Sequence, residues 1–427
     1  NVSAAVGIGS LGLAFDLDTQ VFNKTVNAKM LGDATASRDI QIKAESTDRV
    51  YQTAASAGAG LGAGAGVAAV SVISNTVEAQ IGDNVTVRAG DDLMVDSDQN
   101  IAMIQTAGSA AGGAVGAGAS IGVLYAKASN TASIGNYAQV SARDQLDVTA
   151  DTDIDMNQNV AGFSGGALAA ISGSVGFNML KNQTTASIGN YAQVNQLASY
   201  NDTASQAVTV QANENVMTQG GAGAAAIGGA AGVGIGVAVT VNRGSVSASL
   251  GNYVQLFASD DVRVDADSTK NISNQGIAAA GGIGLGAAGS VALTLIGGSM
   301  SDNASDALNN DGGNMVAESD GQITKDRQAG SQDSDSAGAQ LASYTGNEET
   351  SANTLVQSQT SGFRTDVEGN AASSTSATVG HNAVIRTAGD VVVEAEETIS
   401  LSQIAGGAAV GSVGVGGFVA VADYAGD

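Results

Sequence analysis

The triplet Ile134-Gly135-Asn136 and the run Leu146-Asp147-Val148-Thr149-Ala150-Asp151 contain the two signals that decide the fold of this chain. The triplet consists of an aliphatic residue, then Gly, then Asp, Asn or His. It recurs as Leu31-Gly32-Asp33, Ile81-Gly82-Asp83, Ile134-Gly135-Asn136, Ile188-Gly189-Asn190, Leu250-Gly251-Asn252 and Val379-Gly380-His381. Its glycines lie 50, 53, 54, 62 and 129 residues apart. A period of about 50 residues is typical of solenoids and repeat arrays rather than of globular enzymes.

The second signal is a short run in which apolar residues occupy every second position. It is found at residues 40–45, 146–151, 262–267 and 391–396. Strict alternation predicts a strand with one buried and one solvated face. Asp, Gly, Ser or Arg residues come directly before each run, and these residue types favour tight turns.

Between the alternating runs lie uncharged tracts rich in Gly and Ala, at residues 55–73, 107–125, 161–180, 219–241, 276–298 and 405–422. Within them the period is again two, as where Val233, Ile235 and Val237 alternate with Gly234 and Gly236. Two tracts are long enough to span a bilayer, but the period of two favours strands over a membrane helix. A face of Gly and Ala permits another layer of backbone to approach closely.

Stacking of these units predicts an all-β fold, a parallel β-helix or solenoid built from imperfect repeats of about 50–60 residues. We expect it to be right-handed, with two or three strands per coil and two coils of roughly 20–25 residues in each repeat. The predicted organisation is solenoid repeats in 1–298, a polar acidic insertion in 299–370 and a continuing solenoid repeat in 371–427. The insertion is interpreted either as a binding element or as a solvated loop.

Composition excludes several kinds of function. The 16 basic and 41 acidic residues give a net charge of −25, which disfavours nucleic acid as a partner. The chain has no Cys, Pro or Trp, so thiolate nucleophiles and thiolate metal sites are absent. Its one histidine, His381, occupies the third place of a turn triplet. We therefore expect no catalytic residues and no enzyme activity.

Calcium is the only cofactor that the residues suggest. Hard cations prefer clustered carboxylates, and the candidates are three pairs with nearby acids: Asp91 and Asp92, Asp151 and Asp153, and Asp260 and Asp261. The alternative interpretation is that such alternating acids form only the solvated face of a strand. None of the pairs matches a known calcium-binding loop motif.

The repeat resembles those of large bacterial exoproteins in three features. These are the Gly-Asp or Gly-Asn corners, the alternating strand, and the Gly/Ala tract that runs into Val-x-Val-x-Asn. The exoproteins that it resembles are the filamentous-haemagglutinin-like adhesins exported by two-partner secretion and the leukotoxin-type repeat proteins. The resemblance covers nearly the whole chain except residues 299–370. It does not extend to the N-terminal secretion domain of the family, which is not present in this sequence. It implies an extracellular β-helical rod at the bacterial cell surface, used for adhesion, aggregation or biofilm cohesion.

Two functions are consistent with these observations. The first is an adhesive rod whose partners are a host or neighbouring cell surface or the extracellular matrix, with no membrane span of its own. The second is a self-assembling filament subunit, in which solenoid edges of successive copies stack end to end. The chain begins and ends in the same phase of the repeat, and we expect either neighbouring repeats of a longer chain or other copies of itself to cover these edges.

Overall fold

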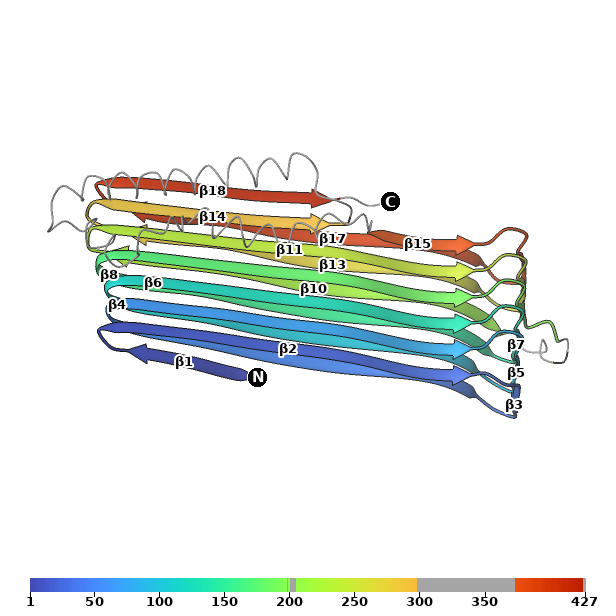
Figure 1. Ribbon diagram of the computed structural model, residues 1–427. Coiled ribbons are helices and arrows are strands. Elements are labelled where there is room, and N and C mark those ends of the chain that lie inside the picture. Colours follow the sequence, from blue (N-terminus) through green and yellow to red (C-terminus); the bar gives the residue numbers. More distant parts are fainter. Residues whose placement is uncertain (198, 200–204, 298–372, 425–427) are drawn as a thin grey trace.

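The computed structural model describes residues 1–197, 199, 205–297 and 373–424. The secondary-structure elements that these residues form are all β-strands. Neighbouring strands pair in parallel throughout, and successive coils stack into a flattened slab whose long dimension follows the strands (Figure 1). The predicted parallel β-solenoid is therefore confirmed. The strands are β1 (Val2–Ile8), β2 (Leu11–Met30), β3 (Ala34–Ala36), β4 (Ile40–Ile81), β5 (Thr86–Ala89), β6 (Leu93–Ile134), β7 (Gln139–Ala142), β8 (Gln145–Ile188), β9 (Gln193–Val194), β10 (Ala207–Gly228), β11 (Ala231–Leu250), β12 (Gln255–Ala258), β13 (Val262–Gly281), β14 (Leu285–Ile296), β15 (Ser374–Val379), β16 (Val384–Thr387), β17 (Val391–Val410) and β18 (Val413–Tyr424).

Each repeat forms one coil with three strand segments. An outward limb runs away from the short strands, reverses, and continues as a return limb of similar length (Figure 1). In β4, β6 and β8 both limbs belong to one continuous element, whereas β10 with β11, β13 with β14 and β17 with β18 are separate outward and return limbs. The third segment is a short strand, and the short strands of successive coils form a sheet of their own in the order β16-β12-β9-β7-β5-β3.

The expectation of two coils in each repeat was wrong. Ile40 pairs with Leu93, and Leu93 pairs with Leu146, so one full repeat separates neighbours in the stack. The physical reason is that the alternating run and the Gly/Ala tract do not form separate strands. The run that starts at Ile40 continues without a break into the tract, and the chain reverses only near Leu61.

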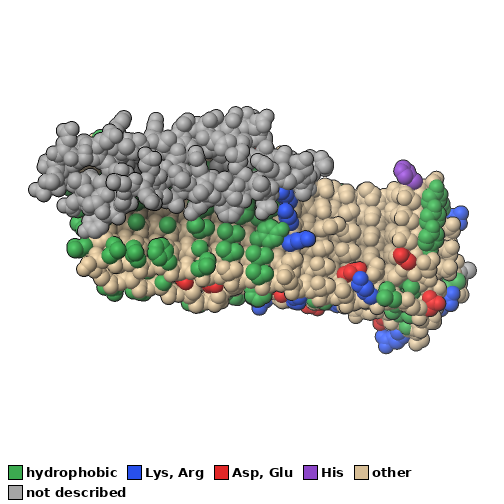
Figure 2. Space-filling view, in the orientation of Figure 1, with side chains coloured by type: hydrophobic (Ala, Val, Ile, Leu, Met, Phe, Trp, Pro, Cys, Tyr) green, Lys and Arg blue, Asp and Glu red, His purple; other side chains and the backbone are tan. Residues whose placement is uncertain are grey.

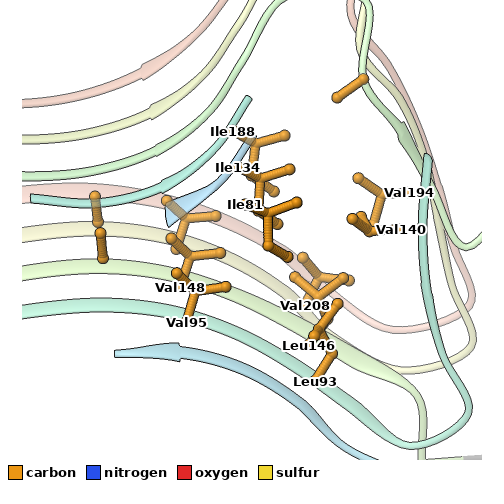
Figure 3. Close-up of a cluster of buried hydrophobic side chains, with 14 of the residues drawn as sticks. Ile81, Leu93, Val95, Ile134, Val140, Leu146, Val148, Ile188, Val194 and Val208 are labelled. Carbon is orange, nitrogen blue, oxygen red and sulfur yellow. The ribbon is translucent and has the colours of Figure 1, made fainter. Parts of the chain in front are cut away.

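At the end of the coil that carries the short strands, three walls enclose an aliphatic core. Figure 3 shows Ile81, Ile134 and Ile188 in one column, facing Val140 and Val194. These side chains are almost completely buried. Burial of this kind stabilises a fold by about 25 cal/mol per Å² of apolar surface, so side-chain packing holds this end, which we call the wide end.

At the opposite end, near the reversals, the two limbs approach so closely that backbone faces backbone. A Cβ atom placed on Gly234 would lie 2.4 Å from the carbonyl oxygen of Ala279, and one on Gly118 would lie 2.6 Å from that of Phe163. No side chain larger than hydrogen fits at such positions without moving the opposite limb. The Gly/Ala tracts therefore build a thin end, and the predicted close approach of a second backbone layer is confirmed.

Between the two ends Gln52, Gln105 and Gln158 form a buried amide ladder across three successive coils. The same register column continues through Gly220, which has no side chain to extend the ladder, to Asn274 and the half-buried Gln403. Gln105 donates to Gln52 Oε1 at 2.6 Å, and Gln158 donates to Gln105 Oε1 at 2.8 Å. Gln105 also donates to the return-limb carbonyls of Ala69 and Val123, at 3.1 and 3.0 Å. The ladder links these three coils and also joins outward limbs to return limbs, while satisfying polar groups that are costly to bury alone.

The predicted insertion, residues 299–370, lies entirely outside the described residues. On its two sides, β14 and β15 pair with the same strand: Ile296 is opposite Asn242, and Ser374 is opposite Ser245. The return limb of this coil therefore resumes its register on β11 after the segment.

Candidate functional site

Two of the predicted calcium candidates, Asp91 and Asp92, lie at the corner between β5 and β6. There they meet Asp144 from the equivalent corner of the next coil, and all three carboxylates offer an oxygen within 4.8 Å of the others. The acids that follow nearby in the sequence, Asp96 and Asp98, do not belong to this cluster. The missed partner follows from the register, because position 144 is one coil after position 91.

The corner cluster also has a structural role. Asp92 Oδ1 accepts a hydrogen bond from the backbone N–H of Gln145 at 3.1 Å, and Asp144 Oδ1 accepts one from Ser205 Oγ at 2.7 Å. Calcium takes six to eight oxygen ligands, so three carboxylates would supply only part of a coordination shell. These residues could hold a hard cation together with water, but the same oxygens already connect successive coils.

The other candidate pairs do not converge into a cluster of three ligating side chains within the described residues. Asp261 Oδ1 accepts from the backbone N–H of Asp390 at 2.8 Å, and the backbone oxygen of Asp260 accepts from Thr387 Oγ1. Both bonds lead to the following coil. Asp260 and Asp261 therefore act as corner connections in the structure.

Asp151 and Asp153 lie on the outer face of the outward limb of β8. Asn213 Nδ2 donates to Asp151 Oδ1 at 2.6 Å. Asp153 lies between two amides, accepting from Asn100 at 3.4 Å and from Asn215 at 3.1 Å. These carboxylates form rungs between coils, and each has a neutral donor as its partner.

Acidic residues also stack on one another along this outer face. Glu45, Asp98 and Asp151 occupy one register column on successive coils. Burial raises the pKa of Asp98, and the negative charge of Glu45 raises it further; burial is likewise the main cause of the raised pKa of Asp151. Lys43 offsets part of this charge through an ion pair with Asp96 at 3.1 Å. The outer face is therefore a negatively charged surface that favours cationic partners.

The turn triplets form a corner column at the wide end. A Cβ atom on Gly189 would lie 2.7 Å from the backbone of the coil before it, which explains the glycine. The third residue of each triplet reaches along the stack: Asn136 Oδ1 accepts from the backbone N–H of Asn190 at 2.9 Å, and Asn252 Oδ1 accepts from that of His381 at 2.8 Å. His381 is thus a turn residue, as the sequence predicted.

Sequence reasoning missed a column of three exposed tyrosines directly after these triplets. The rings of Tyr137 and Tyr191 stack at 4.9 Å with 3° between their planes, and those of Tyr191 and Tyr253 stack at 4.8 Å with 4°. All three residues have a left-handed backbone, with φ of 58°, 58° and 60°, which costs a residue with a side chain roughly 1–2 kcal/mol. The available signal was the repeated Asn-Tyr dipeptide at the end of the triplet.

The kind of side chain on the surface changes along the length of the limbs. Figure 2 shows rows of hydrophobic side chains on the half of this face near the reversals, whereas Lys, Arg, Asp and Glu lie mostly nearer the short strands. No helix within the described residues is long and apolar enough to cross a membrane. The two tracts that are long enough to span a bilayer, 219–241 and 276–298, lie over most of their described residues in strands β10, β11, β13 and β14 instead.

Comparison with known proteins gives no relative: no family model, curated protein or solved structure matches this chain. The functional argument therefore depends on the architecture and surface of the molecule.

Proposed function

We propose that this chain is an extracellular structural and adhesive rod of a large bacterial surface exoprotein. In this proposal it mediates adhesion, aggregation or biofilm cohesion and performs no catalysis. The observation that carries the proposal is the continuous connection between coils. Backbone pairing, the amide ladder, the corner asparagines and the stacked tyrosines all run along the same axis.

Such a molecule suits a mechanical task. Its backbone pairing repeats from coil to coil along the described stack, so stiffness does not depend on one local cluster. The acidic outer face keeps the rod soluble, while the tyrosine column presents exposed aromatic edges and hydroxyl groups near the wide end. Aromatic side chains with a polar tip are common at binding surfaces, and we therefore place the adhesive contact there.

Adhesion can be tested with beads coated with the purified chain. We expect coated beads to clump, or to attach to cultured animal cells or biofilm matrix, more than beads coated to the same density with albumin. Replacement of all three column tyrosines by Asn should reduce attachment while the left-handed turn is retained, because Asn84 and Asn382 occupy the equivalent turn position with φ of 58° and 56°. Intact rods in electron micrographs without attachment in any assay would refute the proposal.

A second candidate function is a filament subunit, and the exposure of the two outermost described coils favours it. Val6, Leu13 and Phe15 are exposed on β1 and β2, and Val413 and Phe418 are exposed on β18. A coil of the same chain or of another copy would cover such edges in the same way. Electron microscopy of the purified chain separates the two, because end-to-end stacking gives filaments of indefinite length and a stalk gives rods of one length.

A further inference from the structure

Lys270 is buried in the interior of the solenoid, at a position that is aliphatic in neighbouring coils. Its counterparts in the register are Ile101, Ile154 and Val216 before it and Ile399 after it. The Lys270 side chain is completely buried. A charged residue in an aliphatic column is costly unless a nearby group compensates it.

Two glutamates, one from each adjacent coil, face this lysine. Glu214 and Glu397 share one register column, with Ser268 between them. Lys270 Nζ lies 4.0 Å from Glu214 Oε1 and contacts Glu397 Oε1 directly. The Glu214 side chain is completely buried and that of Glu397 is 17% exposed. The ammonium group is thus held between two carboxylates.

Neighbouring polar side chains form hydrogen bonds with the lysine and with both glutamates. Ser373 Oγ accepts from Lys270 Nζ at 2.9 Å. Tyr424 donates its hydroxyl to the other oxygen of Glu397, Oε2, at 3.0 Å. On the far side, Asn182 donates to Glu214 Oε2, and Ser268 donates to Glu214 Oε1 at 3.3 Å.

This arrangement holds an amine, a carboxyl group to be attacked and a separate carboxyl group able to move protons. We propose that Lys270 and Glu397 condense in the folded protein to form an intramolecular amide cross-link, with Glu214 as the proton relay. The reaction joins Lys270 Nζ to Glu397 Cδ and breaks the bond between Cδ and Oε1.

The protons balance without any other reactant. The ammonium group of Lys270 loses two protons through Glu214, and both end on Oε1, which leaves as water. The amide nitrogen keeps one proton, and Glu214 returns to its starting state. As the nitrogen attacks, negative charge develops on Oε2, where the hydroxyl of Tyr424 donates; such donors stabilise tetrahedral intermediates.

Burial favours both the relay and the product. Desolvation raises the pKa of Glu214, although Lys270 opposes part of the effect, so Glu214 accepts a proton more readily than an exposed glutamate does. Condensation also replaces a buried ammonium and a partly buried carboxylate with a neutral amide. The desolvation cost of the ion pair is therefore relieved in the product, while the fold supplies the proximity.

The cross-link would join β13 to β17, which precede and follow residues 298–372 in the chain. It is tested on the complete chain, purified in its folded form and weighed by mass spectrometry in denaturant. We expect a mass lower than the sequence mass by one water molecule, and a protease digest in which the peptides containing Lys270 and Glu397 are joined. A folded sample, with strand content shown by circular dichroism, that has the full sequence mass would overturn the proposal.

Three variants assign the roles. Lys270→Ile restores the aliphatic residue of the column and should have the full sequence mass. Glu214→Gln keeps the side-chain shape but cannot relay protons, so we expect cross-linking to slow by about 100-fold; an unchanged rate would overturn the assignment of Glu214. Lys43→Met is the matched control, because Lys43 belongs to an exposed ion pair with Asp96, and the loss of water should persist in this variant.

Discussion

The two ends of each coil are closed by opposite means. At the wide end, large aliphatic side chains fill a space between three walls, and the cluster continues from coil to coil. At the thin end there is no such space, because glycines bring the two limbs into backbone contact. Added volume should therefore be harmful at the thin end, and removed volume should be harmful at the wide end.

The largest effect is expected from removing volume at the wide end. Ile134 is 1% exposed and lies between Ile81 and Ile188 in the stack. Ile134→Ala should destabilise the surrounding coils by about 2–5 kcal/mol, because the neighbouring coils prevent the cavity from closing. Hydrogen exchange resolved by coil measures the loss. Ile104→Ala, at an outer position that is 38% exposed, is the control; equal losses for the two variants would contradict the role of this core.

At the thin end, adding a single methyl group should have a comparable or somewhat smaller effect. Gly234→Ala would place Cβ at 2.4 Å from a carbonyl oxygen, and such overpacking costs about 1–3 kcal/mol. Gly223→Ala in the neighbouring outward limb meets no atom within 4 Å and should be neutral or slightly stabilising. Thermal unfolding followed by circular dichroism distinguishes them, and a shift of the same sign in both would show that backbone contact does not determine tolerance.

Between the two ends, the amide ladder should be sensitive to loss of polarity rather than to volume. Gln105→Leu leaves Gln158 without its acceptor and two return-limb carbonyls without their donor. We expect a loss of about 1–3 kcal/mol, seen as faster amide exchange in both limbs. Gln41→Leu, on the exposed outer face, tests whether the loss comes from the buried hydrogen bonds; if it is equally harmful, the ladder is not responsible.

The smallest expected effect concerns the outer face and depends on pH. The pKa of Asp151 is raised above its ordinary 3.8, so ionisation disfavours the folded state. Asp151→Asn should therefore stabilise the chain at neutral pH, by roughly 0.2–1 kcal/mol. The gain should shrink as pH falls through the folded pKa and vanish below 3.8, where both states are protonated. Unfolding temperatures at pH 7 and pH 3 measure it, and Thr149→Asn on the same limb should show no such pH dependence.

Much of the architecture could be predicted because it depends on short-range patterns. The alternation in residues 146–151 indicates a strand, and the glycines of residues 232–236 indicate a close backbone approach. The number of coils could not be predicted in this way. An alternating pattern does not mark the residue at which a strand reverses. Near Leu61 the residues on both faces of the strand are small, so the sequence is equally compatible with a straight strand and with a reversal.

The candidate site required the register, which no local pattern supplies. Asp91 and Asp144 come together only because the stack aligns positions one coil apart. The tyrosine column has the same origin, and so does the pairing of Lys270 with glutamates from two different coils. In each case the residue types were visible in the sequence, but their contacts depend on pairing across a complete repeat.

That pairing also determines how the rod can form. Leu93 meets Leu146, and no strand pair in the long sheet joins residues close in sequence, so the described part of the chain offers no hairpin from which folding could start. The first coil must bear the cost of closing a long loop before any pairing stabilises it. Each later coil pairs with the exposed strand edge of the coil that formed before it. Folding should therefore resemble crystal growth, in which slow nucleation is followed by the addition of layers. A chain that stops folding part-way should contain a shorter stack of folded coils rather than be wholly unfolded.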